Sequence, residues 1–153
     1  MKVFVTGATG FVGKRLIRRL LLRGDQVVAL TRSRHNMTGN ESGDRLLVIE
    51  GDPAKPGDWQ QQVTGCDAVV TLAGEPVFGE RWSTAFKERL ESSRIESAKQ
   101  MCAAMAPLGP EARPRVWVAA SAIGYYGARG DEGLTENAAP GEDFLARLCV
   151  RWE

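Results

Sequence analysis

The chain has 153 residues, of which 25% are charged, and its 20 basic and 19 acidic side chains give a formal net charge of +1. This length predicts one domain with a sizeable core, and the even charge balance gives no general attraction to nucleic acid or to anionic membranes. No apolar run reaches the roughly 18 residues of a membrane span, and the N-terminus lacks a signal-peptide pattern, so we expect a cytoplasmic protein.

Cysteine and histidine are scarce. The three cysteines, Cys66, Cys102 and Cys149, lie far apart and form no Cys-x-x-Cys pair, so we expect buried, reduced thiols. His35 is the only histidine and lies in a polar stretch. We therefore expect no zinc site of the usual Cys/His type and no Ser-His-Asp hydrolase chemistry.

A glycine-rich turn follows the first predicted strand, residues 2–5, and leads into an amphipathic helix. Its glycines, Gly7, Gly10 and Gly13, allow a tight turn, close approach to a ligand and close packing of the helix on the strand. The free N–H groups of the first helical turn then face an anion, for which a pyrophosphate is the natural occupant. A P-loop is excluded, because Ala8 replaces its first glycine and Arg15 its magnesium-binding hydroxyl. The pattern predicts dinucleotide binding.

The end of the second predicted strand, residues 26–31, indicates which dinucleotide binds. NAD-specific sites place a carboxylate about 20 residues beyond the glycine motif, where it accepts from the ribose 2′-OH. Here Thr31, Arg32 and Ser33 occupy that region without a carboxylate. A guanidinium beside hydroxyls suits a 2′-phosphate, so we expect NADP rather than NAD. The alternative is that Arg32 and Arg34 only open a mobile surface loop that continues to Gly43.

Two further buried strands are predicted at residues 45–52 and 68–74. Asp52, at the tip of the first, either accepts from the exocyclic amine of an adenine or forms, with Pro53, the turn into a short helix at residues 58–63. The second strand ends in Ala73 and Gly74, small residues that let a cofactor's ribose and phosphates approach the backbone.

A long helix is predicted from an N-cap at Ser83 to about residue 106. One side of it carries an apolar stripe consisting of Phe86, Leu90, Ala98, Met101 and Met105. Arg94 falls in the middle of that stripe, where a charge is costly unless it is paired, so it should meet an anion or carbonyl groups near the strand ends. A contact to cofactor or substrate and a structural salt bridge, for instance with Glu75, both remain open.

The fifth predicted strand, residues 115–121, leads into a loop that carries both tyrosines, Tyr125 and Tyr126. At the carboxyl end of a parallel strand, their hydroxyls would face the nicotinamide side of a dinucleotide crevice. The alternative is that both rings simply pack with their hydroxyls satisfied locally. A loop at 127–142 and a helix at 142–153 follow. The alternation of strands and helices predicts an α/β fold, a doubly wound parallel sheet with helices on both faces.

Several motifs together resemble the atypical extended short-chain dehydrogenase/reductases, in the "epimerase family protein" branch. The resemblance covers the whole chain and rests on Thr-Gly-Ala-Thr-Gly-Phe-Val-Gly at 6–13, Leu-Ala-Gly-Glu-Pro at 72–76, Arg-Trp at 81–82, Ser-Arg at 93–94, Ser-Ala-Ile-Gly-Tyr-Tyr-Gly at 121–127 and Phe-Leu-Ala-Arg-Leu-Cys at 144–149. It implies a Rossmann-type fold and an NADP(H)-binding oxidoreductase or epimerase-like protein with a small-molecule substrate. It also implies four groups of cofactor contacts: Gly7, Thr9, Gly10, Phe11 and Val12 at the pyrophosphate, Thr31 and Arg32 at the 2′-phosphate, Leu72 and Ala73 along the adenosine, and Arg94.

The chain departs from the family in its catalytic residues. Short-chain dehydrogenases use Tyr-x-x-x-Lys, in which the lysine lowers the pKa of the tyrosine so that the phenol can move a proton. Here the residues four positions after the two tyrosines are Arg129 and Gly130, and the assisting serine of the family falls at Ala122. Ser121 and Tyr126 are the remaining candidates for positioning a substrate carbonyl. The alternatives are a non-catalytic NADP(H) sensor that has lost the dyad, or a domain with a vestigial site.

The chain also departs from the family in length. Members of the family continue for about as many residues again, with further strands and a small substrate-binding domain. The resemblance therefore implies that residues 1–153 are the cofactor domain alone, truncated after the fifth strand and the following helix. A homodimer through the long helices is a further expectation from the resemblance.

Overall fold

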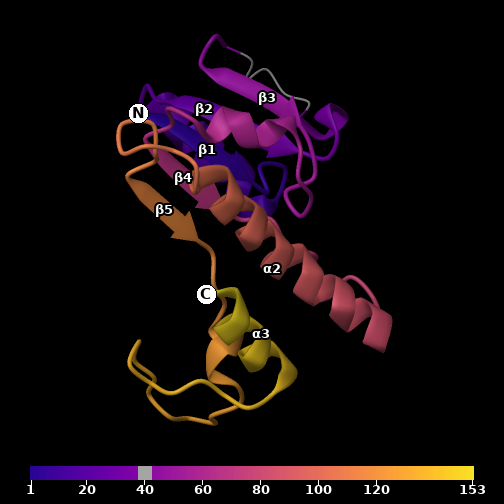
Figure 1. The fold of residues 1–153 in the computed structure, drawn as a ribbon. Helices are drawn as coiled ribbons and strands as arrows, with labels where there is room; N and C mark the ends of the chain where they lie inside the picture. The colour runs from indigo at the N-terminus through magenta and orange to yellow at the C-terminus, as the bar shows by residue number, and fades with distance from the viewer. Residues whose placement is uncertain (38–42) are drawn as a thin grey trace. The chain divides into compact units, whose positions relative to one another are not determined.

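The computed structural model describes residues 1–37 and 43–153, and it divides into two compact units, residues 1–119 and 120–153. The larger unit contains the sheet and two long helices, and the smaller contains a short helix and a long loop (Figure 1). Part of the predicted surface loop, residues 38–42, lies outside the described residues.

The sheet has five strands in the order β3-β2-β1-β4-β5. All neighbouring strands pair in parallel, and the strands are β1 (Lys2–Thr6), β2 (Gln26–Thr31), β3 (Leu46–Glu50), β4 (Ala68–Thr71) and β5 (Val116–Ala119). The chain moves outward from β1 to β3 and then returns to the other side of β1 for β4. The predicted Rossmann-type sheet is confirmed, and this reversal places a crevice at the carboxyl ends of β1 and β4, where such folds bind ligands.

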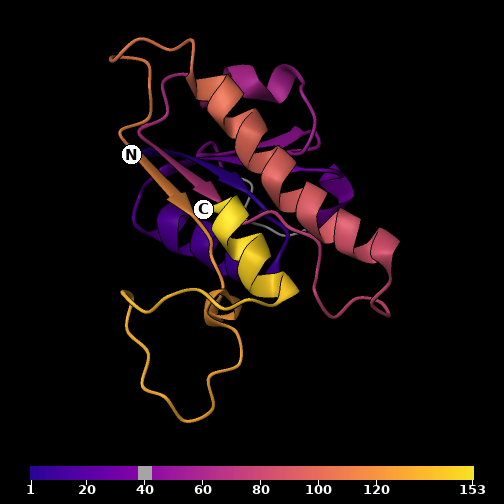
Figure 2. The same ribbon diagram turned by 60° about the horizontal axis from the view of Figure 1, so that its bottom comes forward.

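Side chains of the central strands alternate between two cores, one on each face of the sheet. Phe4 and Val28 pack on one face with Trp59, Val63 and Met101, which come from the helices that follow β3 and β4. The opposite core holds neighbouring strand residues together with side chains of the first helix: Val3, Val5, Ala8, Ile17, Leu20, Val27, Ala29 and Ala68. Because successive residues of a strand point to opposite faces, β1 and β2 are buried on both sides. Figure 2 shows the two long helices on opposite sides of the sheet.

The helix ends follow the predicted local signals. Helix α1 (Phe11–Leu22) is followed by Gly24 with φ +90°, which lets the Asp25 amide bond back to the Leu20 carbonyl at 3.0 Å. Helix α2 (Thr84–Met105) begins at Ser83, whose hydroxyl accepts a hydrogen bond from the Phe86 amide at 3.2 Å. Both the glycine stop and the serine cap were predicted from the sequence and are confirmed.

The buried stripe of α2 differs in part from the prediction. Phe86, Leu90 and Met101 are buried as expected, but Ala98 is only half-buried, and Ser97 is buried instead. After Leu90, the side of the helix that faces the core therefore runs through Ser97 rather than through Ala98. Ser97 fits there because its hydroxyl donates to the Ser93 carbonyl at 2.7 Å, which satisfies its polar group.

Short helices connect the remaining elements. In the larger unit these are the 3₁₀ helices η1 (Arg34–Met37) and η2 (Asp58–Val63), and in the smaller unit η3 (Ile123–Tyr126) precedes helix α3 (Phe144–Trp152). Asp143 caps α3 by accepting from the Ala146 amide at 2.9 Å. The predicted helix at 142–153 is thus present, and it begins two residues later than expected.

The thiols are free, but one prediction about them is wrong. Cys66 and Cys149 are buried as expected, whereas Cys102 is exposed, because it lies on the outer side of α2 next to buried Met101. Among the residues described, no cluster of histidine, cysteine and carboxylate side chains could hold a metal ion. No helix in the described part of the chain has the length and apolar character needed to cross a membrane.

The surroundings of Asp25 predict that its carboxylate contributes to the free energy of unfolding and that this contribution is lost in acid. Its buried carboxylate accepts from the N-terminal amine at 2.9 Å and from Arg23 Nε at 2.5 Å. The hydrogen bond from the N-terminal amine, and then that from Arg23, lowers the pKa of Asp25 below its ordinary value. A lowered pKa in the folded state stabilises the fold above the unfolded-state pKa, about 3.9, and this stabilisation is lost as the pH falls through the folded value.

We therefore expect the wild type to lose free energy of unfolding more steeply below about pH 4 than the Asp25→Asn variant. Urea unfolding between neutral and acid pH measures this difference, with Asp44→Asn as the control at an exposed aspartate. Parallel pH curves for wild type and Asp25→Asn would show that Asp25 contributes nothing through ionisation.

Candidate functional site

A cavity of about 280 Å³ lies in the larger unit, at the segments that follow strands β1 to β4. It is lined by Gly7, Thr9, Gly10, Leu30, Thr31, Arg32, Asp52, Pro53, Ala54, Leu72, Ala73, Gly74, Glu75, Pro76, Ser93 and Ser97. Most of the residues predicted to bind a cofactor therefore meet in one place. The cavity lies at the carboxyl end of the parallel sheet, where the fold predicts a ligand.

The glycine turn requires glycine at two positions for packing. Gly7 has φ +68°, and a Cβ there would lie 2.6 Å from the Leu72 carbonyl carbon and 2.7 Å from the Ala73 nitrogen. A Cβ on Gly13 would overlap the Gly7 carbonyl oxygen and lie 3.0 Å from Ala8 Cα. Gly13 thus allows α1 to pack closely on the turn, as predicted, and it is not among the described residues that line the cavity.

The N-terminus of α1 is suited to an anion. Its N-cap, Gly10, provides no side-chain acceptor, and the first turn carries no acidic residue. The amides of that turn and the positive end of the helix dipole are therefore available to a phosphate. Of the predicted contacts in this region, Thr9 and Gly10 line the cavity, whereas Phe11 and Val12 are exposed and are not among the described residues that line it.

Thr31 and Arg32 both line the cavity, at the end of β2. The Thr31 hydroxyl donates to the Ser33 carbonyl at 2.9 Å and accepts from the Ser33 amide at 3.2 Å, so it fixes the backbone that carries Arg32. Arg32 itself is exposed. Its charge is therefore open to a ligand at this end of the cavity.

Asp52 forms the turn that was one of its two predicted roles, whereas its contact to an adenine amine stays a prediction. It lines the cavity, and its carboxylate also accepts from the Ala54 amide at 3.0 Å and lies 3.9 Å from Lys55 Nζ. The turn into η2 is thus built on Asp52. The oxygen that caps Ala54 is Oδ1 and the one that faces Lys55 is Oδ2, so the carboxylate is held in a fixed orientation beside the cavity.

The segment after β4 forms one wall of the cavity and is held at both ends. Thr6 Oγ1 accepts from the amides of Leu72 and Ala73 at 3.2 and 3.3 Å, which ends the strand at Thr71. Further along, the Glu75 amide donates to Ser93 Oγ at 3.0 Å. These bonds fix the backbone of a wall in which small residues leave room for a ligand.

Arg94 anchors the same wall from behind. Its guanidinium donates to the carbonyl oxygens of Glu75 at 3.0 Å and Leu90 at 3.2 Å, and a Cβ on Gly74 would lie 3.1 Å from its Cζ. The prediction that Arg94 meets carbonyl groups near the strand ends is confirmed. The bond to Glu75 uses the backbone carbonyl, and Arg94 is not among the described residues that line the cavity. Its predicted contact to a cofactor stays a prediction.

Part of the cavity lining was not predicted from the sequence. Glu75 was considered only as a salt-bridge partner of Arg94, and Pro76, Ser93 and Ser97 were not predicted to line a cavity. The spacing of the two serines from buried Leu90 and Met101 nevertheless places them on the covered side of a helix. Leu30, Pro53 and Ala54 complete the set. Their small or apolar side chains carried no chemical signal in the sequence.

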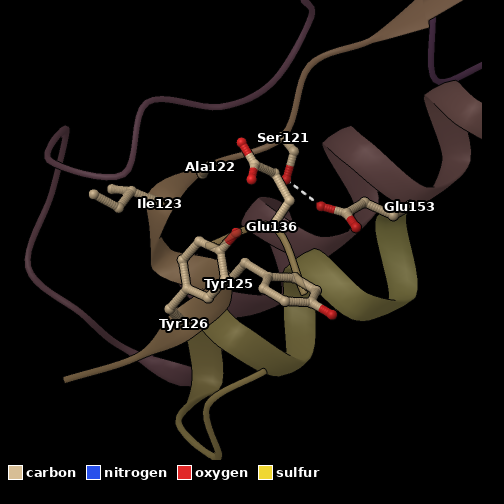
Figure 3. A pocket seen from close by; sticks show the side chains of 7 residues that line it. All are labelled: Ser121, Ala122, Ile123, Tyr125, Tyr126, Glu136 and Glu153. Atoms are coloured by element: carbon tan, nitrogen blue, oxygen red, sulfur yellow. Dashed lines mark hydrogen bonds between the residues drawn. The ribbon is translucent and has the colours of Figure 1, made fainter. Parts of the chain in front are cut away.

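The two catalytic candidates lie in a second cavity, within residues 120–153. It has a volume of about 550 Å³ and is lined by Ser121, Ala122, Ile123, Tyr125, Tyr126, Glu136 and Glu153 (Figure 3). The tyrosine rings meet edge to face with centroids 5.1 Å apart. The structure thus brings Ser121 and Tyr126 together and adds two carboxylates, Glu136 and Glu153, that the sequence analysis missed.

Comparison with known proteins agrees with the dinucleotide geometry. A family model described as NAD(P)H-binding matches residues 7–142. The chain is 37% identical to "Epimerase family protein SDR39U1 homolog, chloroplastic" of Arabidopsis thaliana, covering 100% of this chain and 43% of the relative. It is 31% identical to "Epimerase family protein SDR39U1" of Homo sapiens, covering 100% of this chain and 48% of the relative.

Solved structures show the same fold. The structure of human epimerase family protein SDR39U1 with NADPH aligns over 99% of this chain and 47% of its own, with a TM-score of 0.75 and 27% identity. A UDP-glucuronic acid 4-epimerase from Bacillus cereus aligns over 99% of this chain and 49% of its own, with a TM-score of 0.82 and 22% identity. The chain spans about half the length of the curated relatives it matches. Because the NAD(P)H-binding model matches most of its residues, from the glycine turn to beyond the tyrosine segment, the chain belongs to the NAD(P)H-binding family and is similar to the SDR39U1-type epimerase family proteins.

Proposed function

We propose that this chain is the NADP(H)-binding part of an oxidoreductase or epimerase-like protein of the atypical extended short-chain dehydrogenase type. The observation that carries the choice of NADP is Arg32, which lines the cavity at the end of β2 with its side chain exposed. No carboxylate follows β2 within residues 31–37, where an NAD site would hold one. A solved relative that is 27% identical to this chain is described as containing NADPH.

The residues present fit this cofactor. The amides at the start of α1 would hold the pyrophosphate, Thr31 and Arg32 the 2′-phosphate, and the backbone from Leu72 to Gly74 the adjoining ribose. When bound, the nicotinamide would supply or take up a hydride. In this proposal Ser121 and Tyr126 position the carbonyl or hydroxyl group of a small-molecule substrate.

Titration with NADPH, and separately with NADH, tests the proposal. Tryptophan quenching and energy transfer to the reduced nicotinamide report binding. We expect Arg32→Ala to weaken NADPH binding by about tenfold, close to 1.4 kcal/mol, because it removes a charge-assisted contact to the 2′-phosphate. NADH, which lacks that phosphate, should bind wild type and variant alike.

Arg18→Ala is the matched control for this titration, since it removes an exposed arginine on α1 that does not line the cavity. It should leave NADPH affinity unchanged. Equal affinity of the wild type for the two nucleotides would contradict the choice of NADP. Binding of neither nucleotide would contradict the proposal as a whole.

The absent Tyr-x-x-x-Lys pair favours a second function, a non-catalytic NADP(H) sensor. This protein would bind NADPH with the same dependence on Arg32 and transfer no hydride to any substrate. Slow hydride exchange between bound NADPH and a panel of carbonyl compounds separates the two functions. Exchange supports the enzyme, and tight binding without exchange supports the sensor.

A further inference from the structure

The wall that follows β4 in the cavity of the larger unit carries a carboxylate, that of Glu75, which is half-buried. The backbone of Glu75 is held from α2. Its amide donates to Ser93 Oγ at 3.0 Å, and its carbonyl oxygen accepts from Arg94 Nη2 at 3.0 Å. Because both bonds use main-chain atoms of Glu75, the wall is fixed while the carboxylate keeps its capacity to accept hydrogen bonds.

The hydroxyl groups next to Glu75 on this wall already have acceptors. Ser93 Oγ donates to the Leu90 carbonyl oxygen at 3.1 Å, and Ser97 Oγ donates to the Ser93 carbonyl oxygen at 2.7 Å. Among the residues that the structure describes, none forms a hydrogen bond or ion pair with the carboxylate of Glu75. This carboxylate is therefore open to a ligand in the cavity.

The order of the strands places Glu75 and Arg32 at opposite ends of the cavity. Arg32 follows β2 and Glu75 follows β4, and β1 with its glycine turn lies between these two strands. A dinucleotide with its 2′-phosphate at Arg32 and its pyrophosphate at the glycine turn therefore extends its other half toward β4. That half begins with the nicotinamide ribose, which carries neighbouring hydroxyl groups and no charge.

We infer that Glu75 binds the cofactor by accepting a hydrogen bond from the hydroxyl groups of the nicotinamide ribose; the inference rests on the proposed function. An ionised carboxylate only accepts hydrogen bonds and repels phosphate, so it needs a donor on an uncharged part of the ligand. Ribose hydroxyls are such donors, and a charge-assisted hydrogen bond is stronger than a neutral one. Glu75 thus orients the half of the cofactor that carries the reactive ring.

Two ligands separate this contact from the rest of the site. They are NADPH and adenosine 2′,5′-bisphosphate, which keeps the adenosine and the 2′-phosphate but lacks the nicotinamide ribose. We expect Glu75→Gln to weaken NADPH binding by about tenfold and to change the affinity for the bisphosphate by less than about twofold. Arg32→Ala should weaken the binding of both, because both carry the 2′-phosphate. Isothermal titration calorimetry on the whole chain measures these affinities.

The direction of the change in NADPH affinity is itself informative. A carboxylate that contacts no hydroxyl would act on the cofactor only through its negative charge. Its removal in Glu75→Gln would then strengthen the binding of the anionic cofactor or leave it unchanged. A weaker binding of NADPH therefore requires a favourable contact that the variant has lost.

The nicotinamide carboxamide is another hydrogen-bond donor on the same half of the cofactor. The analogue 3-acetylpyridine adenine dinucleotide phosphate keeps the ribose but lacks the amide N–H groups. Glu75→Gln should weaken the binding of this analogue by the same factor as that of NADPH. Wild-type affinity of the variant for the analogue would assign the contact to the carboxamide and overturn the inference.

Glu80→Gln is the matched control. Glu80 is exposed in the same loop, pairs with Arg89 at 2.6 Å, and is not among the described residues that line the cavity. This variant should bind NADPH and the bisphosphate as the wild type does. Glu75→Gln should unfold at the same urea concentration as the wild type, because the bonds that hold the wall use the backbone of Glu75.

The inference and the proposed function fail on different results. Wild-type or higher NADPH affinity in Glu75→Gln, or an equal loss for NADPH and the bisphosphate, would overturn the inference alone. Absence of NADPH binding in the wild type would overturn the proposed function and, with it, the inference.

Discussion

Gly13→Ala is expected to weaken NADPH binding by about a hundredfold, close to 2.8 kcal/mol, and to destabilise the fold by about 1–3 kcal/mol. The added Cβ would overlap the Gly7 carbonyl oxygen and lie 3.0 Å from Ala8 Cα, and both contacts are with backbone. Backbone cannot rotate away as a flexible side chain can, so α1 must move off the turn. The amides at the start of α1 then move relative to Gly7 and Gly10, which line the cavity.

NADPH titration and urea unfolding measure these two effects on the same protein. Gly109→Ala is the matched control, because a Cβ there meets no heavy atom within 4 Å and its φ is not positive. We expect the control to change the free energy of unfolding by less than about 0.5 kcal/mol. Wild-type NADPH affinity in Gly13→Ala would show that the helix can shift without disturbing the anion site.

Phe4→Ala is expected to lower the free energy of unfolding by about 3–5 kcal/mol. Phe4 is 0% exposed, lies on the central strand β1, and packs against Trp59 with ring centroids 5.9 Å apart. Its removal leaves a cavity between the sheet and the helices that follow β3 and β4, because these elements are packed from several sides and cannot collapse into the space. The strand that carries the glycine turn would lose its main packing contact on that face.

Urea unfolding followed by tryptophan fluorescence measures this loss. Phe78→Ala is the control, since Phe78 is 98% exposed in the loop between β4 and α2 and buries almost nothing. The control should unfold within about 0.5 kcal/mol of the wild type. A similar loss in both variants would mean that fold stability does not depend on the core at Phe4.

Hydrogen bonds between residues far apart in the sequence shape much of the candidate cofactor site. Thr6 holds Leu72 across 66 positions, and Ser93 holds the Glu75 amide across 18. Neither pair can be recognised from the residues around it in the sequence. A buried serine or threonine looks like any other residue of a helix or strand until its hydrogen-bond partner is known. The hydrogen bond from the Ala54 amide to Asp52 and the backbone carbonyl partners of Arg94 were likewise decided by the turns around them.

The sequence by itself determined the kind and order of the elements and predicted a dinucleotide site at the glycine turn. Apolar periodicity, the Ser83 cap, the Gly24 stop and the glycine turn are all read from residues within one or two helical turns of each other, so local sequence is sufficient. Only the tertiary structure brought Glu153 to Ser121, across 32 positions. That pairing depends on the path by which the loop from 127 to 142 returns to η3 and on where α3 ends. Both are set by the tertiary fold and not by the local sequence.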